Sequence, residues 1–206
     1  MGYSAVDFRR GDKPLDILRR ASSLYEGSTW TNGNGTVARV AELAVNADGC
    51  IYGLLHLENP ALGICGHTAL VIKTHRWTEN GQRQFAWKDM TESVGPAYYG
   101  MSRRMFAKLA PLESLGISAQ PLEWASAWRA GVREQHDKLA RLKALARNAI
   151  VEFAEEVSFG NFKTTRFAVA DKPGQFYALD PATSQVQFLC RLRRQTLLER
   201  TWSLAS

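Results

Sequence analysis

The stretch "HTALVIKTHRWTENGQRQFAWKDM", residues 67–90, decides the fold because it holds two strands and the turn between them. Asn80-Gly81 predicts a tight hairpin turn, since both residue types tolerate the positive φ that such reversals need. The run "TALVI", residues 68–72, lacks polar alternation, so we expect its strand to lie centrally, with at least one face covered. Two more strands are predicted at residues 36–45 and 50–58, and the hairpins make the sheet antiparallel.

The segments around this sheet carry helical patterns. A first strand is predicted at residues 2–8, followed by a helix in residues 11–27 with Asp12 as its cap and Pro14 in its first turn. A second short helix is predicted over residues 100–112. Residues 121–148 read as a long helix with one apolar face. We expect that face to contain Trp124, Trp128, Val132, Gln135, Leu139, Leu142 and Ala146, and the other face to carry Arg129, Arg133, Arg141 and Lys143.

The remainder of the chain is predicted to be mostly strand, at residues 149–159, 166–180 and 184–192. Short strands joined by tight turns are typical of a small barrel or a compact sheet. The predicted fold class is therefore α+β. An N-terminal antiparallel sheet with short helices spans residues 1–118, a long connecting helix spans residues 119–148, and a small β-barrel-like module with a basic C-terminal segment spans residues 149–206.

The composition is that of a globular protein, with 45% hydrophobic and 22% charged residues. The apolar runs are too short to cross a bilayer and the N-terminus lacks a secretory pattern, so we expect a cytoplasmic protein without membrane contact. The three cysteines form no CxxC motif, which indicates free thiols. The four histidines lack the paired spacing of metal ligands, so we expect no metal and no cofactor.

The net charge of +6 favours contact with phosphates or acidic protein surfaces. We expect the exposed face of the long helix and the C-terminal basic residues to form the binding surface. Its residues are Arg129, Arg133, Arg141, Lys143, Lys163, Arg166, Arg191, Arg193 and Arg194.

A second arrangement suits nucleic acid, because aromatic residues interleave with cations along two strands. Such rings can stack bases while the cations hold the backbone, although strand aromatics more often belong to the core. The aromatic residues are Trp77, Phe85, Trp87, Tyr98 and Tyr99, and the cations are Arg76, Arg83 and Lys88.

Two groups of residues have side chains suited to catalysis. Asp89 and Glu92, beside Lys88, could serve acid–base chemistry if their pKa values were pushed apart, but the same residues suit a polar strand end before a turn, and we favour the strand end. Cys65 and His67 lie two apart on one strand and could meet as a nucleophile pair. A small buried thiol beside a hairpin is the more common explanation, so no catalytic residue is assigned.

The segment "FAWKDMTESVGPAYYG", residues 85–100, also carries a resemblance. Together with the helix around Trp128 and Arg129, it resembles an uncharacterised family of small proteins carried by phages, plasmids and integrative elements. The resemblance covers residues 1–135, and Tyr3 stands where family members have Trp in a Met-Gly-aromatic start. The shared KDM-E-GP-YY motif comprises Lys88, Asp89, Met90, Glu92, Gly95, Pro96, Tyr98 and Tyr99. The family has no established activity, so the resemblance implies a mobile-element context and no reaction.

These observations favour a non-catalytic accessory protein of a phage or mobile element. We expect it to act in the bacterial cytoplasm by binding nucleic acid or a host-defence complex of the restriction or CRISPR type. One alternative is a hydrolase-type enzyme that uses Asp89 with Glu92, or Cys65 with His67. Another is a structural or oligomerising protein in which the stripe around Trp124 meets another chain.

Overall fold

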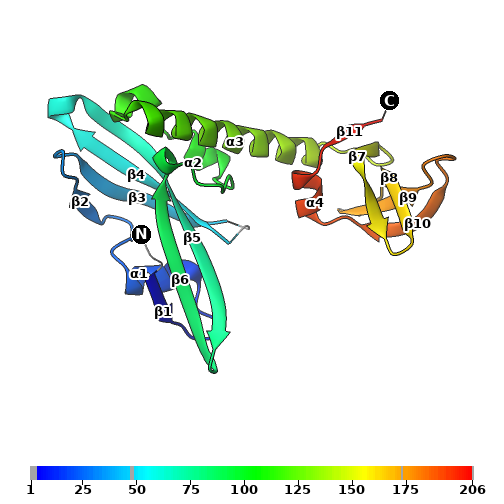
Figure 1. Ribbon diagram of the computed structural model, residues 1–206, viewed down its shortest axis with the longest axis horizontal. Helices are drawn as coiled ribbons and strands as arrows, with labels where there is room; N and C mark the ends of the chain where they lie inside the picture. Colours follow the sequence, from blue (N-terminus) through cyan, green and yellow to red (C-terminus); the bar gives the residue numbers. More distant parts are fainter. Residues whose placement is uncertain (1–3, 47–48, 173, 206) are drawn as a thin grey trace. The chain divides into compact units, whose positions relative to one another are not determined.

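The computed structural model describes residues 4–46, 49–172 and 174–205, so the prediction on Tyr3 lies outside the described residues. The chain divides into two compact units, residues 1–133 and 134–206. The division falls inside the long helix α3 (Ala119–Lys143). The α+β fold class is confirmed: a curled antiparallel sheet with short helices is followed by α3 and then by a second antiparallel sheet (Figure 1). Within the described residues, no helix combines the length and apolar character needed to cross a membrane.

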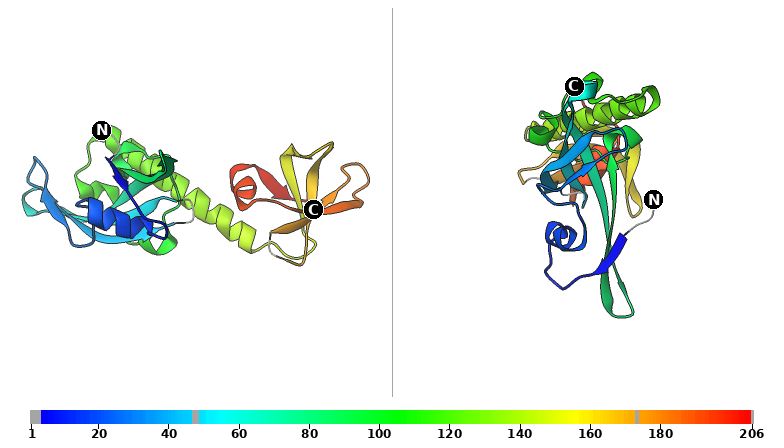
Figure 2. Two further views of the ribbon diagram at one scale, coloured as in Figure 1. Left: turned by 90° about the horizontal axis from the view of Figure 1, so that it is seen from below. Right: turned by 90° about the vertical axis from the view of Figure 1, so that its left-hand side faces the viewer.

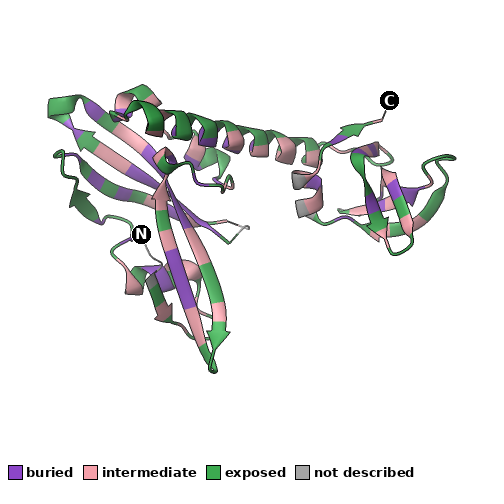
Figure 3. Cartoon of the chain, in the orientation of Figure 1, coloured by how far each residue is buried: buried purple, intermediate pink, exposed green. Residues whose placement is uncertain are grey.

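Unit 1 is built on a six-stranded antiparallel sheet, and its central hairpin is the one predicted from residues 67–90. Asn80 and Gly81 have φ values of 49° and 76°, as the tight turn requires. The central strand is covered on both faces, because residues 69–72 are all buried (Figure 3). The spatial order is β1 (Ser4–Asp7), β6 (Gln82–Thr91), β5 (Ile64–Glu79), β4 (Ile51–Asn59), β3 (Val37–Val45) and β2 (Thr29–Thr31).

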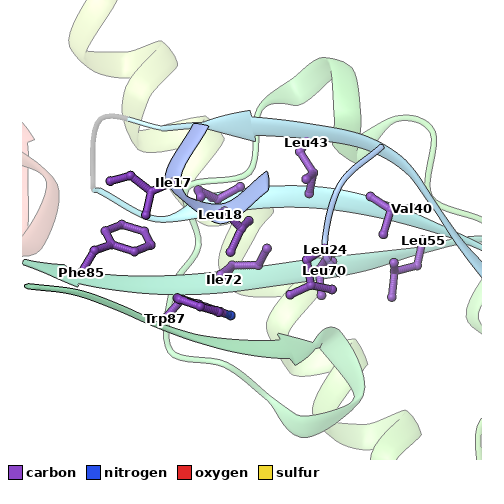
Figure 4. Close-up of a cluster of buried hydrophobic side chains, with 11 residues drawn as sticks. Ile17, Leu18, Leu24, Val40, Leu43, Leu55, Leu70, Ile72, Phe85 and Trp87 are labelled. Carbon is purple, nitrogen blue, oxygen red and sulfur yellow. The ribbon is translucent and has the colours of Figure 1, made fainter. Parts of the chain in front are cut away.

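One face of this sheet is covered by helix α1 (Pro14–Ala21), which buries Ile17 and Leu18 (Figure 4). Pro14 lies in the first turn as predicted, but the prediction of Asp12 as the cap is wrong. Lys13 occupies the cap position, and the Asp12 carboxylate instead accepts hydrogen bonds from the Arg9 main-chain N–H and the Arg20 side chain. The sheet residues that share this core are Val40, Leu43, Ile51, Leu55, Leu70, Ile72, Phe85 and Trp87.

The other face carries α2 (Arg103–Phe106) and the first half of α3. Short 3₁₀ turns, η1 (Pro60–Leu62), η2 (Glu92–Val94) and η3 (Leu112–Leu115), connect these elements. The predicted inner face of α3 holds for Trp128 and Val132, which are buried, and fails for Trp124, which is 42% exposed. The core on this face also contains Cys50, Tyr52, Leu54, Ala69, Val71, Met101 and Met105.

Unit 2 is a five-stranded antiparallel sheet whose last strand returns to pair with its first. Its strand order is β10 (Val186–Arg191), β9 (Gln175–Leu179), β8 (Phe162–Val169), β7 (Ile150–Phe159) and β11 (Trp202–Leu204). Helix α4 (Arg194–Glu199) precedes β11, and both are visible in red in Figure 2. These two elements of the basic C-terminal segment were not predicted from the sequence. Both elements contribute to the core of unit 2, which buries Leu192, Leu197 and Trp202.

Candidate functional site

The Glu92 carboxylate, which was considered for acid–base chemistry, is buried in a fully occupied hydrogen-bond network. Its Oε2 accepts from Arg129 Nε at 2.6 Å, and its Oε1 accepts from Arg129 Nη2 at 2.8 Å. Oε1 also accepts from Thr68 Oγ1 at 2.8 Å and from the Ala69 main-chain N–H at 3.2 Å. Both oxygens are therefore engaged in joining η2, β5 and α3.

Other residues of the KDM-E-GP-YY segment also contact α3. The indole N–H of Trp128 donates to the Tyr98 carbonyl oxygen at 2.9 Å. Gly131 lies against the ring of Tyr99 so closely that a Cβ there would approach ring carbon Cε1 to 2.6 Å. Gly95, in turn, lies under the side chain of Trp124. The segment therefore fixes the helix on the sheet, which agrees with the preference for a strand end over a reaction site.

Asp89 and Lys88, at the start of the segment, lie in β6 and do not share the environment of Glu92. Asp89 is exposed and lies opposite Ile72, whereas Lys88 is half-buried opposite Lys73. Asp89 therefore does not share a site with Glu92, and both oxygens of Glu92 are already occupied by hydrogen bonds from Arg129, Thr68 and Ala69.

His67, which was paired with Cys65 from the sequence, has His56 as its ring neighbour. The two rings face each other across β4 and β5 with centroids 5.1 Å apart, and Cys65 is exposed. Burial lowers the pKa of His67, and the positive charges of His56, Lys108 and Arg39 lower it further. Within the described residues, no three His, Cys, Asp or Glu side chains are grouped to hold a metal ion.

Two residues of the predicted binding surface belong to unit 1. Arg129 was expected on the exposed face of the long helix, and this prediction is wrong: only 7% of the residue is exposed. Its guanidinium is held by Glu92 and by the Ala110 carbonyl oxygen, to which Nη1 donates at 2.7 Å. Arg133 is exposed and lies over the ring of Phe106 at 5.5 Å.

The other residues of that surface belong to unit 2, and several are engaged in contacts within it. Arg141 lies over the Trp202 ring at 4.6 Å, Lys163 faces Glu156 at 3.8 Å, and Arg166 donates to Ser184 Oγ at 2.7 Å. Lys143, Arg191 and Arg193 are exposed, and the side chain of Arg194 lies outside the described residues.

A shallow cavity of about 320 Å³ lies in unit 1, between the segment that follows β1 and the end of the β5–β6 hairpin. It is cationic and aromatic at once. Its lining residues are Phe8, Arg10, Gly11, Arg76, Trp77, Thr78 and Arg83. We call this cavity the arginine pocket.

Arg76 is held in place within the arginine pocket. Its guanidinium lies 5.1 Å from the ring centroid of Phe8 and 5.8 Å from that of Phe85. Its Nη2 also donates to the Asp12 carbonyl oxygen at 3.2 Å. Ring contacts and a hydrogen bond to a neutral carbonyl orient a guanidinium without neutralising it.

The positive charges of the arginine pocket also lack carboxylate partners in the described part of the chain. Between the described residues, Arg10, Arg76 and Arg83 form no ion pair with a carboxylate. The nearby Asp12 carboxylate is itself engaged by Arg20, which holds the pKa of Asp12 below its usual range. Three positive charges therefore line one concave surface.

Protein-family models, curated proteins and solved structures yield no match to this chain. Within the arginine pocket, Trp77, Arg76 and Arg83 were named from the sequence as part of the aromatic and cationic alternation. Phe8 and Arg10 were missed. The signal was present in "DFRRGD", residues 7–12, but those residues lie more than sixty positions before Arg76, and the pairing of β1 with β6 brings them beside the hairpin.

Proposed function

We propose that this protein is a non-catalytic accessory protein that binds nucleic acid through the arginine pocket. The observation that carries the proposal is the convergence of Arg10, Arg76 and Arg83 around one cavity, with the ring of Phe8 beside the Arg76 guanidinium. Guanidinium groups bind phosphate oxygens through paired hydrogen bonds, and aromatic rings stack on bases. The resemblance to proteins of mobile elements suggests that the nucleic acid belongs to such an element or to its host.

Between the two partner classes considered from the sequence, the pocket favours nucleic acid over a host-defence protein complex. The core of a protein–protein interface is depleted of charged residues, although Arg and aromatic residues are enriched in interfaces as a whole. The arginine pocket instead gathers three arginines that have no ion-pair partner among the described residues, and the Phe8 ring lies beside them. This pairing of phosphate-binding and base-stacking groups is typical of nucleic-acid sites.

The test is fluorescence anisotropy with a labelled oligonucleotide over a salt series from about 50 to 200 mM. If three phosphates are neutralised, log K should fall with log salt at a slope of about −2 for a single strand. Arg83→Gln should weaken binding and reduce the slope by about 0.7, because one phosphate contact is lost.

The matched control is Arg39→Gln, which removes one positive charge from an exposed position on β3 of the same unit. Arg39 does not line the pocket, so we expect its replacement to change the slope by much less than Arg83→Gln does. Absence of binding at low salt, or equal effects of the two replacements, would overturn the proposal.

A further inference from the structure

We infer that the arginine pocket binds the phosphorylated end of a nucleic-acid strand. Arg76, Thr78 and Arg83 hold the terminal phosphate, and Arg10 holds the next phosphate of the strand. This inference rests on the proposed function and specifies which part of the nucleic acid enters the site. It follows from the face on which these side chains lie, from their charge and from their hydrogen-bond donors.

Three polar side chains extend from one face of the β5–β6 hairpin. Thr78 lies directly opposite Arg83 in the register of the two strands, and Arg76 lies opposite Phe85. Residues two apart on a strand share a face. Opposite and diagonal neighbours of an antiparallel pair have Cβ atoms about 5–8 Å apart. The guanidinium groups of Arg76 and Arg83 and the hydroxyl of Thr78 can therefore reach one small anion.

The ring contacts of Arg76 identify this face. Its guanidinium lies beside the rings of Phe8 and Phe85, which belong to the core that α1 covers. Trp77 extends from the opposite face of β5, where its ring stacks on that of His75 with centroids 5.4 Å apart. The assignment of a phosphate site therefore depends on the arginines and Thr78, and not on the Trp77 ring.

The charge of the pocket matches a terminal phosphate. A phosphate monoester carries about two negative charges at pH 7 and has three free oxygens, whereas each phosphate inside a strand carries a single charge. Arg76 and Arg83 balance the monoester, which leaves Arg10 for the adjoining phosphate. None of the three arginines has a carboxylate partner among the described residues.

Arg76 is already oriented for this contact. Its Nη2 donates to the Asp12 carbonyl oxygen at 3.2 Å, and the Phe8 ring lies 5.1 Å from its guanidinium. A guanidinium has several N–H donors in a fixed plane, so donors remain for a paired contact with phosphate oxygens. A lysine would keep the charge and lose this paired geometry.

The experiment compares three strands of the same sequence, oligothymidylates of about 15 nucleotides that carry the label internally. One has a 5′-phosphate, one has a 3′-phosphate, and one has hydroxyl groups at both ends. Affinity is measured by anisotropy for the wild-type protein, for Arg76→Lys and for the matched control Arg39→Lys, an exposed position on β3 that does not line the pocket. Thermal melting checks that both variants fold, and thymidine 5′-monophosphate is tested as a competitor.

We expect the wild-type protein to bind at least one phosphorylated strand roughly tenfold more tightly than the hydroxyl-ended strand, the gain typical of a hydrogen bond to a charged group. Arg76→Lys should remove most of this gain, and Arg39→Lys should keep it.

The remaining outcomes separate this inference from the proposed function. If the hydroxyl-ended strand binds as tightly as both phosphorylated strands while Arg83→Gln still weakens binding, the inference is wrong and the proposed function stands. If thymidine 5′-monophosphate binds as tightly as the phosphorylated strands, the ligand is a free nucleotide and the inference is wrong. If no strand binds at low salt, both are wrong.

Discussion

Replacement of Glu92 by Gln should destabilise unit 1 far more than its small change in shape suggests. The two oxygens of Glu92 each accept a hydrogen bond from Arg129, one from Nε and one from Nη2. A glutamine must turn its NH₂ group toward one of these donors in either orientation. The Arg129 charge would then remain buried without its counter-ion, because only 7% of that residue is exposed.

The expected cost follows from this burial. Removing one partner of a buried ion pair costs about 3–5 kcal/mol of the free energy of unfolding. At about 2–4 °C per kcal/mol for a chain of this size, the melting temperature should fall by about 6–20 °C. Replacing both Glu92 and Arg129 by Met should cost roughly 2 kcal/mol less than the sum of the two single replacements, because no unpaired charge remains.

The assay is urea unfolding followed by circular dichroism, together with thermal melting. The matched control is Glu42→Gln, the same chemical change at a partly exposed carboxylate of the same sheet that pairs with Arg104 and Lys108. We expect the control to cost less than about 1 kcal/mol, as partly exposed ion pairs do. If Glu92→Gln lowers the free energy of unfolding no more than the control does, the conclusion that the Glu92–Arg129 pair fixes α3 on the sheet is refuted.

Three further predictions concern other positions. Burial and neighbouring positive charge lower the pKa of His67, so the unfolded chain binds that proton more tightly, and the free energy of unfolding should decrease as the pH falls below about 6.5. In urea unfolding at pH 7.5 and 5.5, about one pH unit on either side of the ordinary histidine pKa, His67→Asn should reduce this decrease, and an unchanged decrease would contradict the assignment. Burial raises the pKa of the Cys190 thiol, whereas Cys65 is exposed, so a thiol reagent should modify Cys65 first. A fast phase of thiol modification that persists in Cys65→Ser would contradict this. Gly131→Ala should not raise the free energy of unfolding by the roughly 1 kcal/mol usual in a helix, because its Cβ would collide with Tyr99. The stabilisation should appear when Tyr99 is also replaced by Ala. Full stabilisation with Tyr99 present would show that the ring moves aside freely.

The sheet of unit 1 could be predicted because its signals are local. The turn at Asn80-Gly81 and the apolar run at residues 68–72 each fix their own conformation, and the strands of the central hairpin follow from them. Alternation in residues 149–192 likewise predicted most strands of unit 2.

The position of Arg129 could not be predicted in the same way. A charged residue beside an apolar stripe is normally solvated, so the helical pattern predicted that Arg129 would lie on the exposed face of the helix. Its actual partner, Glu92, lies 37 residues earlier in the chain, and spacing within a helix carries no information about such a contact. Trp124 was misplaced for the related reason that Gly95, beneath it, brings no side chain to bury it.

Helix α4 and strand β11 were not predicted, because the charged residues of that segment obscure the pattern of its few apolar residues. Leu197 and Trp202 are too few to predict a helix and a strand without knowledge of the core they enter. Only some residues of the arginine pocket were predicted from the sequence, for a different reason. Phe8 and Arg10 lie beside the hairpin because β1 pairs with β6.

The most direct test of the proposed site is ultraviolet cross-linking of the wild-type protein to a single strand, followed by mass spectrometry of the cross-linked peptides. We expect cross-links on the peptides that contain Phe8 and Trp77, the two aromatic residues that line the arginine pocket. Cross-links confined to unit 2, around Arg191 and Arg193, would contradict it and would return the binding surface to the C-terminal basic segment.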